Sequence, residues 1–419
     1  MTNVNPHSIE ADRTPLRILF HINDFGKGGT ETALLSWLKT LDRRLFAPSL
    51  SVAYPTDDLA FWRAQSIPED VPVHVLASSK WMYALHQAAR RRKLGTGEKL
   101  LHKLLTYGVI RPLLALRMRH LVRQHDLVCD FDFSLRHMAG SCNVPWFGVN
   151  HFSLAARLGG KSARYIARRV RHYARYSAIT VLIPAMLNEA RELFSTTGVD
   201  MDIVELPNVI DVDALRSAAR AEIKRPAESF IVSVARLDEG QKDHKTLLRA
   251  YAQLRERGRC EAALVLIGDG RDRGELEQLA DQLGIGASVQ FLGFCANPLP
   301  YIRQAEMLVL SSRYEGCAVV LGEAMALGTP VLSADCPTGP RDMLEGGKAG
   351  LLVPVGDVDA MAFGIERLLT DTELRRSVAQ AALQKVETFT PPRANQRMLE
   401  LALRLLAKQD SPSGVLEPR

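Results

Sequence analysis

Short apolar runs alternate with helix-length segments along most of the chain, and this rhythm constrains the fold more than any other feature. Continuous apolar strands joined by helical crossovers form parallel sheets that helices cover on both faces. The sequence therefore predicts an α/β fold with doubly wound parallel sheets. Strands are expected at 16–22, 47–53, 71–76, 126–131, 145–149 and 178–183, and then at 229–235, 262–267, 288–293, 307–311, 329–333 and 350–353.

The two groups of strands predict two domains. A chain of 419 residues is longer than one hydrophobic core usually holds. Pro207 and Asn208 lie between the groups and are typical of a turn or linker. We therefore expect two Rossmann-like domains, 1–206 and 207–390, which face each other across a cleft. Ligands of such sheets bind beyond the carboxyl ends of the strands.

Charge is unevenly distributed between the two halves. Residues 1–200 carry 27 Lys or Arg and 16 Asp or Glu, whereas residues 201–419 carry 26 and 31. Segment 88–123 holds ten basic residues with Glu98 as its single acid, and segment 157–175 holds seven with no acid. Leucines interleaved with such charges are typical of an amphipathic surface helix that meets anionic lipid. A solvated basic face is the ordinary alternative.

Several classes of protein are disfavoured by what the sequence lacks. It has no run of about 18 apolar residues to span a bilayer, and its start does not have the pattern of a secretory signal. Its six cysteines are scattered, which predicts reduced thiols and no structural zinc site. We therefore expect a cytoplasmic protein. Nucleic-acid binding would explain the basic half, but no recognised binding motif accompanies the charge.

A glycine-rich loop follows the first predicted strand. Gly26, Gly28 and Gly29 precede an apolar helix, where backbone amides are expected to be free for a phosphate. The dinucleotide fingerprint GxGxxG fails because Glu31 stands at its third glycine position, which disfavours a Rossmann dehydrogenase. The alternative is an ordinary turn that needs glycine for its dihedral angles.

Cations and carboxylates follow two strands of the second group. Arg236 and Lys242 come after strand 229–235, where they could hold a diphosphate and stabilise its departing charge. Glu315 lies on the loop after strand 307–311, and Glu323 lies inside the next helix. Carboxylates there suit the hydroxyls of a sugar and a ribose, and the helix N-terminus suits a phosphate. The amides that would receive the phosphate are those of Gly316, Cys317, Ala318 and Val319.

Together these motifs resemble the retaining, nucleotide-sugar-dependent glycosyltransferases of family four, a glycogen-synthase-like group with the GT-B fold. The most specific part is the pair Glu315 and Glu323, which are separated by seven residues and followed by Ala-Met-Ala-Leu-Gly-Thr-Pro-Val. The resemblance covers nearly the whole chain. Supporting motifs are Gly28–Glu31, Pro207–Asp211, Arg236 with Lys242, and Gly268–Gly270.

The resemblance implies a role for each motif. Glu315 would contact the donor sugar and Glu323 the ribose, while Arg236 and Lys242 would hold the diphosphate. The glycine loop at Gly28 and Gly29 would approach the phosphates from the N-terminal domain. His151, after an N-terminal strand, looks like the histidine that lies beside the transferred sugar in this family. Taken alone, such a histidine is more often part of the core.

One departure from the family concerns the lysine. The family usually spaces its arginine and lysine five residues apart, whereas Arg236 and Lys242 are six apart. An extra loop residue is the expected reason. Lys245 is the alternative phosphate ligand.

The implied activity is retaining transfer of a hexose or N-acetylhexosamine from a UDP-sugar to a lipid-linked acceptor of a bacterial surface glycan, such as a lipopolysaccharide or capsule precursor. A sugar-nucleotide epimerase or phosphorylase on the same fold is the alternative enzyme. An anionic membrane surface is the expected partner, nucleic acid is not, and the protein is expected to be peripheral on the inner face of the cytoplasmic membrane.

Neither a cofactor nor a metal is expected, and the C-terminal segment has a structural role. Cations and amides can balance the diphosphate, and the three Asp-x-Asp triplets occur in unrelated contexts. Segment 391–419 begins as an amphipathic helix, which by resemblance crosses back to the N-terminal domain. The triplets are Asp130 with Asp132, Asp211 with Asp213, and Asp357 with Asp359.

Overall fold

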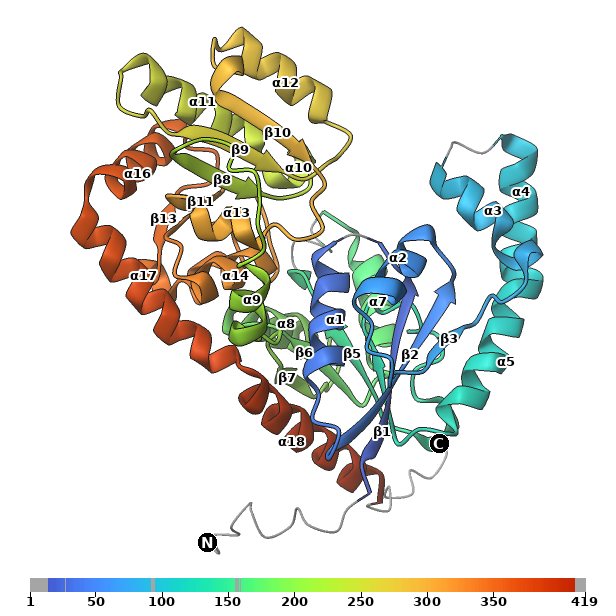
Figure 1. The fold of residues 1–419 in the computed structure, drawn as a ribbon. Coiled ribbons are helices and arrows are strands. Elements are labelled where there is room, and N and C mark those ends of the chain that lie inside the picture. Colours follow the sequence, from blue (N-terminus) through green and yellow to red (C-terminus); the bar gives the residue numbers. More distant parts are fainter. Residues whose placement is uncertain (1–13, 27, 92–94, 155–157, 159, 411–419) are drawn as a thin grey trace, which may run out of the picture.

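The computed structural model describes residues 14–26, 28–91, 95–154, 158 and 160–410. The chain forms two parallel β-sheets, one after the other in sequence, and helical crossovers join the strands of each sheet. The two sheets lie on opposite sides of the middle of the molecule (Figure 1). The predicted α/β architecture with two doubly wound domains is confirmed. Each predicted strand is present, and its bounds agree within two residues at either end.

The N-terminal sheet has seven strands in the order β3-β2-β1-β4-β5-β6-β7. The chain runs from the centre to one edge and then crosses to the other side, so the order reverses between β1 and β4. Such a reversal opens a crevice at the carboxyl ends of the two strands. The strands are β1 (Leu16–Asp24), β2 (Phe46–Tyr54), β3 (Val73–Val75), β4 (Leu127–Asp130), β5 (Trp146–Asn150), β6 (Ala178–Val181) and β7 (Ile203–Glu205).

Helices of the N-terminal half include a helical arm that stands out from the sheet at the right of Figure 1. The arm consists of α3 (Lys80–Arg91), α4 (Thr96–Leu105), the π-helical turn η2 (Thr106–Ile110) and α5 (Arg111–Val122), and it contains most of basic segment 88–123. The remaining helices are α1 (Gly29–Thr40), α2 (Asp57–Gln65), the short η3 (Ser141–Asn143), α7 (Ala163–Tyr173) and α8 (Pro184–Thr196).

The C-terminal sheet has six strands in the order β10-β9-β8-β11-β12-β13, with its own reversal between β8 and β11. The last strand of the first sheet ends at Glu205 and the first strand of the second begins at Phe230, so the predicted boundary at 206 falls between them. The strands are β8 (Phe230–Val234), β9 (Ala263–Ile267), β10 (Val289–Gly293), β11 (Met307–Leu310), β12 (Val331–Ala334) and β13 (Leu351–Val353).

The longer helices of the C-terminal half connect these strands, and short turns complete the crossovers. They are α9 (Val212–Ala218), α10 (Glu239–Lys242), α11 (His244–Glu256), α12 (Arg273–Gln282), η4 (Gly286–Ser288), α13 (Leu299–Gln304), α14 (Val319–Leu327), α15 (Pro340–Met343), η5 (Glu345–Gly347), α16 (Val358–Thr370), α17 (Thr372–Val386) and η6 (Glu387–Phe389).

The final helix, α18 (Pro391–Asp410), leaves the C-terminal domain and packs on the N-terminal one (Figure 1). The Asn395 side chain makes two hydrogen bonds of 2.8 Å to the N-terminal domain. Its Nδ2 donates to the backbone carbonyl of Thr40, and its Oδ1 accepts from the backbone amide of Asp42. Ala394, Met398, Leu401, Ala402 and Leu405 are buried in the N-terminal core. The helix thus follows the course that the resemblance implies, and residues 411–419 lie outside the described part.

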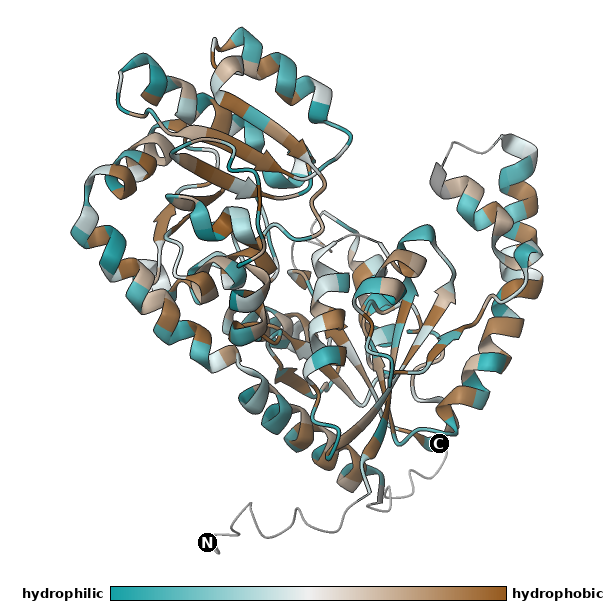
Figure 2. Ribbon diagram, viewed as in Figure 1, coloured by the Kyte–Doolittle hydropathy of each residue, from teal (hydrophilic) through white to brown (hydrophobic). Residues whose placement is uncertain are grey.

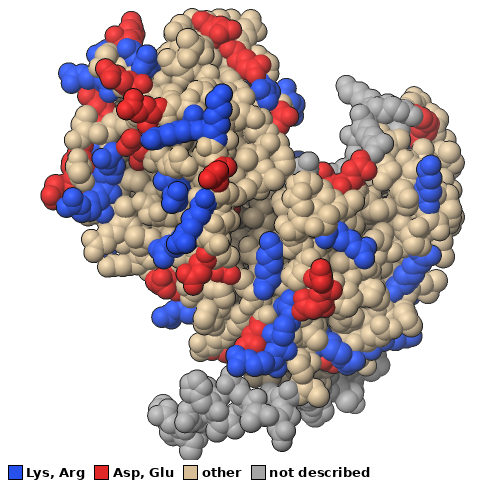
Figure 3. All heavy atoms as spheres, in the orientation of Figure 1, with Lys and Arg blue, Asp and Glu red and all other residues tan. Residues whose placement is uncertain are grey.

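Apolar and basic surfaces meet on the arm. Figure 2 shows hydrophobic residues on its outward side, and Figure 3 shows Lys and Arg on the same side of the molecule. Leu100, Leu101 and Leu104 of α4 are 59%, 50% and 62% exposed. Among the described residues, no helix is both long and apolar enough to cross a membrane.

Candidate active site

Lys242 and Glu315 form an ion pair at the carboxyl end of the C-terminal sheet. Lys242 ends α10 after β8, and Glu315 lies on the loop between β11 and α14. The Lys242 ammonium donates to Glu315 Oε1 at 2.5 Å, and Ser312 Oγ donates to the same oxygen at 2.5 Å. The two charged side chains are only 16% and 5% exposed. Because burial removes both groups from water, each depends on a charged or hydrogen-bonding partner at this place.

The structure places Lys242, and not Lys245, beside Glu315. Lys245 lies at the start of α11 and pairs with Glu275 of α12 at 2.5 Å on the surface. Asp243, the residue directly after Lys242, has a left-handed backbone with φ of 49°. Its carboxylate accepts from Arg313 at 2.8 Å. Lys242 is therefore the lysine of this loop that pairs with Glu315.

Arg236 lies on the same loop but is much more exposed. Its guanidinium donates to Gln241 Oε1 at 3.2 Å and lies 3.6 Å from Asp238, with 64% of the side chain exposed. The motif Gly268–Gly270 packs directly under this loop. A Cβ on Gly268 would lie 1.9 Å from the Ala235 carbonyl oxygen, and φ of +143° also favours glycine there. The glycines therefore let the β9 loop support the loop that carries both cations.

Glu323 lies in the second turn of α14, the helix that follows the Glu315 loop. Burial raises the pKa of its carboxyl group to about 7. No hydrogen bond or ion pair joins this carboxyl group to another described residue. A partly buried carboxyl group without a protein partner is a candidate for binding hydroxyl groups of a ligand.

The loop before α14 meets the N-terminal domain. Phe152 and Gly316 form an antiparallel bridge, and a Cβ on Gly316 would lie 1.6 Å from the His151 carbonyl oxygen. A Cβ on Gly29 would lie 3.7 Å from a Val319 methyl group at the start of α14. The structure thus brings the two predicted halves, Gly29 and His151 on one side and residues 316–319 on the other, into contact.

Two further residues of the predicted site, the buried His151 and the partly buried Cys317, lie at this junction. His151 is 9% exposed, its Nε2–H donates to the Phe131 carbonyl at 2.8 Å, and its ring packs 4.6 Å from the Phe131 ring. The Cys317 thiol contacts the Met343 sulfur at 3.5 Å. Burial raises the pKa of Cys317 to about 12, so the thiol stays protonated and the residue offers only its backbone.

The glycine loop differs from the prediction in one respect. The amides of Gly26 and Gly28 donate to the two carboxylate oxygens of Glu31 at 3.0 and 3.1 Å, so these amides are not free for a phosphate. Glu31 occupies the third position of α1, where a glutamate returns to the residues before the helix. The spacing from Gly28 to Glu31 is that of a capping box, and this spacing in the sequence indicates that Glu31 pairs with the amides.

The Asp-x-Asp triplets have structural roles. Asp211 and Asp357 cap α9 and α16 by accepting from Ala214 and Ala360 amides at 3.0 and 2.9 Å. Asp130 accepts from the Tyr176 hydroxyl at 2.5 Å, and burial raises its pKa to about 8. Across the described ranges, no cluster of three or more potential metal ligands is found.

Residues 216–385 match the family model described as Glycosyl transferases group 1. The chain therefore resembles this family across its C-terminal domain. It is 29% identical over 300 residues to N-acetylgalactosamine-N,N'-diacetylbacillosaminyl-diphospho-undecaprenol 4-alpha-N-acetylgalactosaminyltransferase of Campylobacter jejuni, a match that covers 66% of this chain and 77% of the relative. It is 31% identical over 219 residues to the lipopolysaccharide core biosynthesis glycosyltransferase LpsE of Rhizobium meliloti, covering 52% and 62%.

Solved structures of glycosyltransferases share the fold of this chain. Anabaena Alr3699/HepE in complex with UDP and glucose superposes with a TM-score of 0.70 at 19% identity, covering 93% of this chain and all of that one. The lipopolysaccharide outer core galactosyltransferase WaaB superposes with a TM-score of 0.63 at 19% identity, covering 93% and 99%. The two domains therefore have the GT-B fold.

Proposed function

We propose that this glycosyltransferase moves a hexose or N-acetylhexosamine from a UDP-sugar to a bacterial surface-glycan acceptor and keeps the anomeric configuration. The observation that carries the proposal is the Lys242–Glu315 ion pair beside the N-terminus of α14 and the unpaired Glu323. The name of the Campylobacter relative describes transfer to a saccharide on diphospho-undecaprenol, and HepE binds UDP and glucose. Both support the assignment of donor and acceptor class.

The proposed donor pose uses each group for one part of the molecule. The ribose hydroxyls donate to Glu323, and the diphosphate lies between Lys242 and the amides at the start of α14, with Arg236 on its exposed side. Lys242 then shares its charge between Glu315 and the phosphate, which frees carboxylate lone pairs of Glu315 for the sugar hydroxyls. Since the leaving diphosphate gains negative charge during transfer, these fixed cations stabilise the transition state more than the bound donor.

The reaction is proposed to need no metal and no other cofactor. Lys242, Arg236 and the backbone amides supply the positive charge that a metal ion supplies in other sugar transferases. Chelation with EDTA is therefore expected to leave turnover unchanged. A loss of activity restored by Mn²⁺ or Mg²⁺ would contradict this part of the proposal.

Donor choice can be tested with a panel of nucleotide sugars. UDP-glucose, UDP-galactose, UDP-N-acetylglucosamine, UDP-N-acetylgalactosamine and GDP-mannose would be incubated with the enzyme, and slow hydrolysis to the free sugar would be followed by NMR. We expect a UDP-sugar to be cleaved with release of the α-anomer first. Release of the inverted anomer, or preference for the GDP-sugar, would refute the proposal. Isomerised nucleotide sugar or consumed phosphate would favour the alternative epimerase or phosphorylase.

We also propose that the protein is peripheral on the inner face of the cytoplasmic membrane. Segment 157–175 includes α7, on which Arg164, Arg168 and Arg171 are exposed. Anionic headgroups attract such residues by roughly 1 kcal/mol each. Binding to phosphatidylglycerol vesicles is expected to weaken with salt and in R164E/R168E/R171E, while phosphatidylcholine vesicles bind little. Equal binding to both kinds of vesicle would contradict the proposal that anionic headgroups attract the protein. The side chains of Arg90, Arg91, Arg92 and Lys93, expected to contribute, lie outside the described part.

A further inference from the structure

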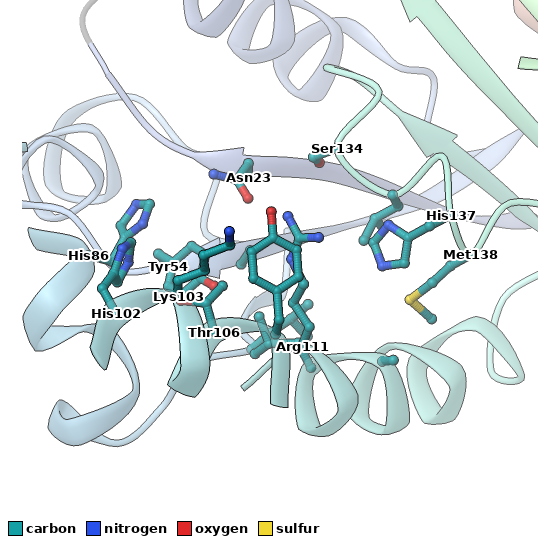
Figure 4. Close-up of a pocket in the computed structure, with 16 residues that line it drawn as sticks. Asn23, Tyr54, His86, His102, Lys103, Thr106, Arg111, Ser134, His137 and Met138 are labelled. Atoms are coloured by element: carbon teal, nitrogen blue, oxygen red, sulfur yellow. The ribbon is translucent and has the colours of Figure 1, made fainter. Parts of the chain in front are cut away.

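The segment that follows β4, residues 131–135, contacts both the candidate active site and a cavity of the N-terminal domain. At its start, the Phe131 carbonyl accepts from His151 Nε2 at 2.8 Å. Near its end, Ser134 and Leu135 line a cavity of about 430 Å³ together with Asn23 of β1 (Figure 4). The shape of this segment, the β4 loop, therefore determines where the carbonyl beside His151 points.

The backbone of the β4 loop is strained at Phe133. Its φ of 57° lies in the left-handed region, which aromatic residues rarely adopt. The buried ring lies against β5, where a Cβ on Gly148 would be 2.2 Å from Phe133 Cε1. Arg136 donates to the Phe133 carbonyl at 2.9 Å. Strained backbone persists only where its surroundings hold it, and it concentrates at functional sites. The groups that hold this loop therefore bear on the function of the neighbouring His151.

Asp132 binds two backbone amides from different segments. Its Oδ2 accepts from the Asn23 amide at 2.9 Å, and its Oδ1 accepts from the Ser134 amide at 3.0 Å. Both of these residues line the cavity (Figure 4). Asp132 thereby fastens the β4 loop to the end of β1, the strand that leads into the glycine loop.

Asp130, the last residue of β4, closes the loop from the buried side. Its carboxyl group is fully buried, and Oδ2 accepts from the Leu135 amide at 2.8 Å and from the Tyr176 hydroxyl at 2.5 Å. Its other oxygen, Oδ1, accepts no hydrogen bond from the described residues. The bond from Leu135 back to Asp130 spans the whole loop and fixes its length.

Asp130 carries a proton at neutral pH. Burial, and next the charge of Asp132, raise the pKa of its carboxyl group to about 8. Its register partner on β1, His21, supplies no cation, because burial lowers the pKa of that imidazole to about 4. Since Oδ2 already accepts two hydrogen bonds, the proton belongs on Oδ1. The group is therefore a neutral acid, and an asparagine amide reproduces its shape and its donor.

The β4 loop determines which ring nitrogen of His151 carries a hydrogen. A carbonyl oxygen only accepts, so Nε2 carries the hydrogen that points to Phe131. The two rings also pack with their centres 4.6 Å apart, and the Phe131 amide donates to the His21 carbonyl at 2.8 Å. A displaced Phe131 would release the His151 ring, whose backbone lies against Gly316 of the C-terminal domain.

We propose that Asp130 and Asp132 are positioning residues for His151. They hold the β4 loop in the strained shape in which the Phe131 carbonyl keeps the imidazole hydrogen on Nε2 and keeps the ring in one orientation beside the domain junction. The inference rests on the proposed function for the part that His151 has in transfer. Neither aspartate belongs to the proposed donor site, so their removal is expected to lower turnover more than donor binding.

NMR of enzyme labelled with ¹⁵N-histidine shows which ring nitrogen of His151 carries the hydrogen, and no substrate is needed. His151→Gln assigns the signals among the eleven histidines. Wild-type enzyme and Asp130→Asn are expected to hold the hydrogen on Nε2. Asp130→Ala and Asp132→Ala are expected to show both tautomers, because the Phe131 carbonyl is no longer held in place. Unchanged His151 signals in both alanine variants, or equal changes in Asp130→Asn and Asp130→Ala, would overturn the inference.

Kinetics of donor hydrolysis test the consequence for turnover, with the UDP-sugar that the donor panel selects. In Asp130→Ala and Asp132→Ala, kcat is expected to fall by about tenfold to a hundredfold, as a small misplacement near the reacting atoms does, while KM for the donor changes little. Asp130→Asn is expected to restore most of kcat. A raised KM at unchanged kcat would overturn the positioning role.

Two further variants separate positioning from general loss of stability. Asp126→Ala removes an ion pair with Arg17, 2.6 Å long, at the opposite end of β4, and is expected to leave kcat and the His151 signals unchanged. An equal change in this variant would overturn the assignment. Tyr176→Phe keeps the ring and removes one hydrogen bond to Asp130, so it is expected to change the His151 signals even if Asp130→Ala does not fold. If no UDP-sugar is used, the proposed function fails, whereas the NMR comparison still decides whether the aspartates position His151.

Discussion

Glu323 is expected to make UDP binding depend on pH around neutrality. Burial raises the pKa of its carboxyl group to about 7, so a large fraction is protonated in the free enzyme at neutral pH. The form that accepts hydrogen bonds from two ribose hydroxyls is the carboxylate. Binding UDP therefore favours the ionised form, and affinity is expected to rise with pH through this range and to fall when the pH is lowered.

The magnitude follows from the fraction that is ionised. With a pKa of about 7, roughly one tenth of the free enzyme carries the carboxylate at pH 6 and roughly nine tenths at pH 8. Since the dissociation constant scales inversely with the competent fraction, it is expected to change by about tenfold between these pH values, or about 1.4 kcal/mol. This is the largest effect that a group with a pKa of about 7 can have over the interval, and it applies if the bound carboxyl group stays ionised.

Calorimetric titration of UDP into wild-type enzyme and Glu323→Gln at pH 6, 7 and 8 measures this effect. The terminal phosphate of UDP titrates near pH 6 in both proteins, so the ratio of the two dissociation constants isolates Glu323. The UDP affinity of the wild-type enzyme is expected to rise relative to that of the variant as the pH rises. A ratio that stays constant across the three pH values would refute the reasoning, because Glu323 would then be either ionised throughout or away from the ribose.

The same pKa has a consequence for stability, with the opposite direction. The carboxyl group releases its proton near its ordinary value of 4.5 in the unfolded chain but only near 7 in the folded one. Between these values the folded state holds more protons, so stability falls as the pH rises. Above pH 7, Glu323→Gln is expected to unfold at a higher denaturant concentration than the wild type.

Three other substitutions test the site and the fold. Lys242→Ala is expected to lower turnover by about a hundredfold to a thousandfold, as the loss of one oxyanion donor does, whereas Lys245→Ala, on the surface pair with Glu275, should be nearly silent in steady-state kinetics. Gly316→Ala is expected to reduce donor use strongly while circular dichroism stays native, because its Cβ would collide with the His151 carbonyl. Leu401→Ala is expected to cost about 2–5 kcal/mol in denaturant unfolding, since α18 buries this side chain in the N-terminal core; an unchanged midpoint would mean that α18 does not pack there.

Much of the fold could be predicted from the sequence because buried parallel strands are continuous apolar runs. No strand is predicted at β7 (Ile203–Glu205), because only Ile203 and Val204 are apolar there, whereas β3 and β13, of the same length, lie within longer apolar runs. The basic segment was predicted as one amphipathic helix, whereas the structure divides its described part between α3, α4, the π-turn η2 and α5. Such breaks depend on packing against the sheet, which local sequence does not report.

The sequence predicts those residues of the candidate site that belong to recognisable motifs. Lys242 and Glu315 follow the ends of β8 and β11, neighbouring strands of the C-terminal sheet, and chain topology alone brings these two segments near one another. The pairing of Lys242 with Glu315 and the left-handed backbone of Asp243 depend on local backbone geometry that the spacing of residues does not reveal.

The return of α18 to the N-terminal sheet determines the order in which the two domains can be completed. The N-terminal sheet is synthesised first, yet one wall of its core is supplied by the last described helix. The strands of the C-terminal sheet are continuous in the chain and can pair as soon as β13 has emerged from the ribosome. The domain that is made first is therefore finished last, and its apolar surface beneath α18 stays uncovered until translation of this helix ends.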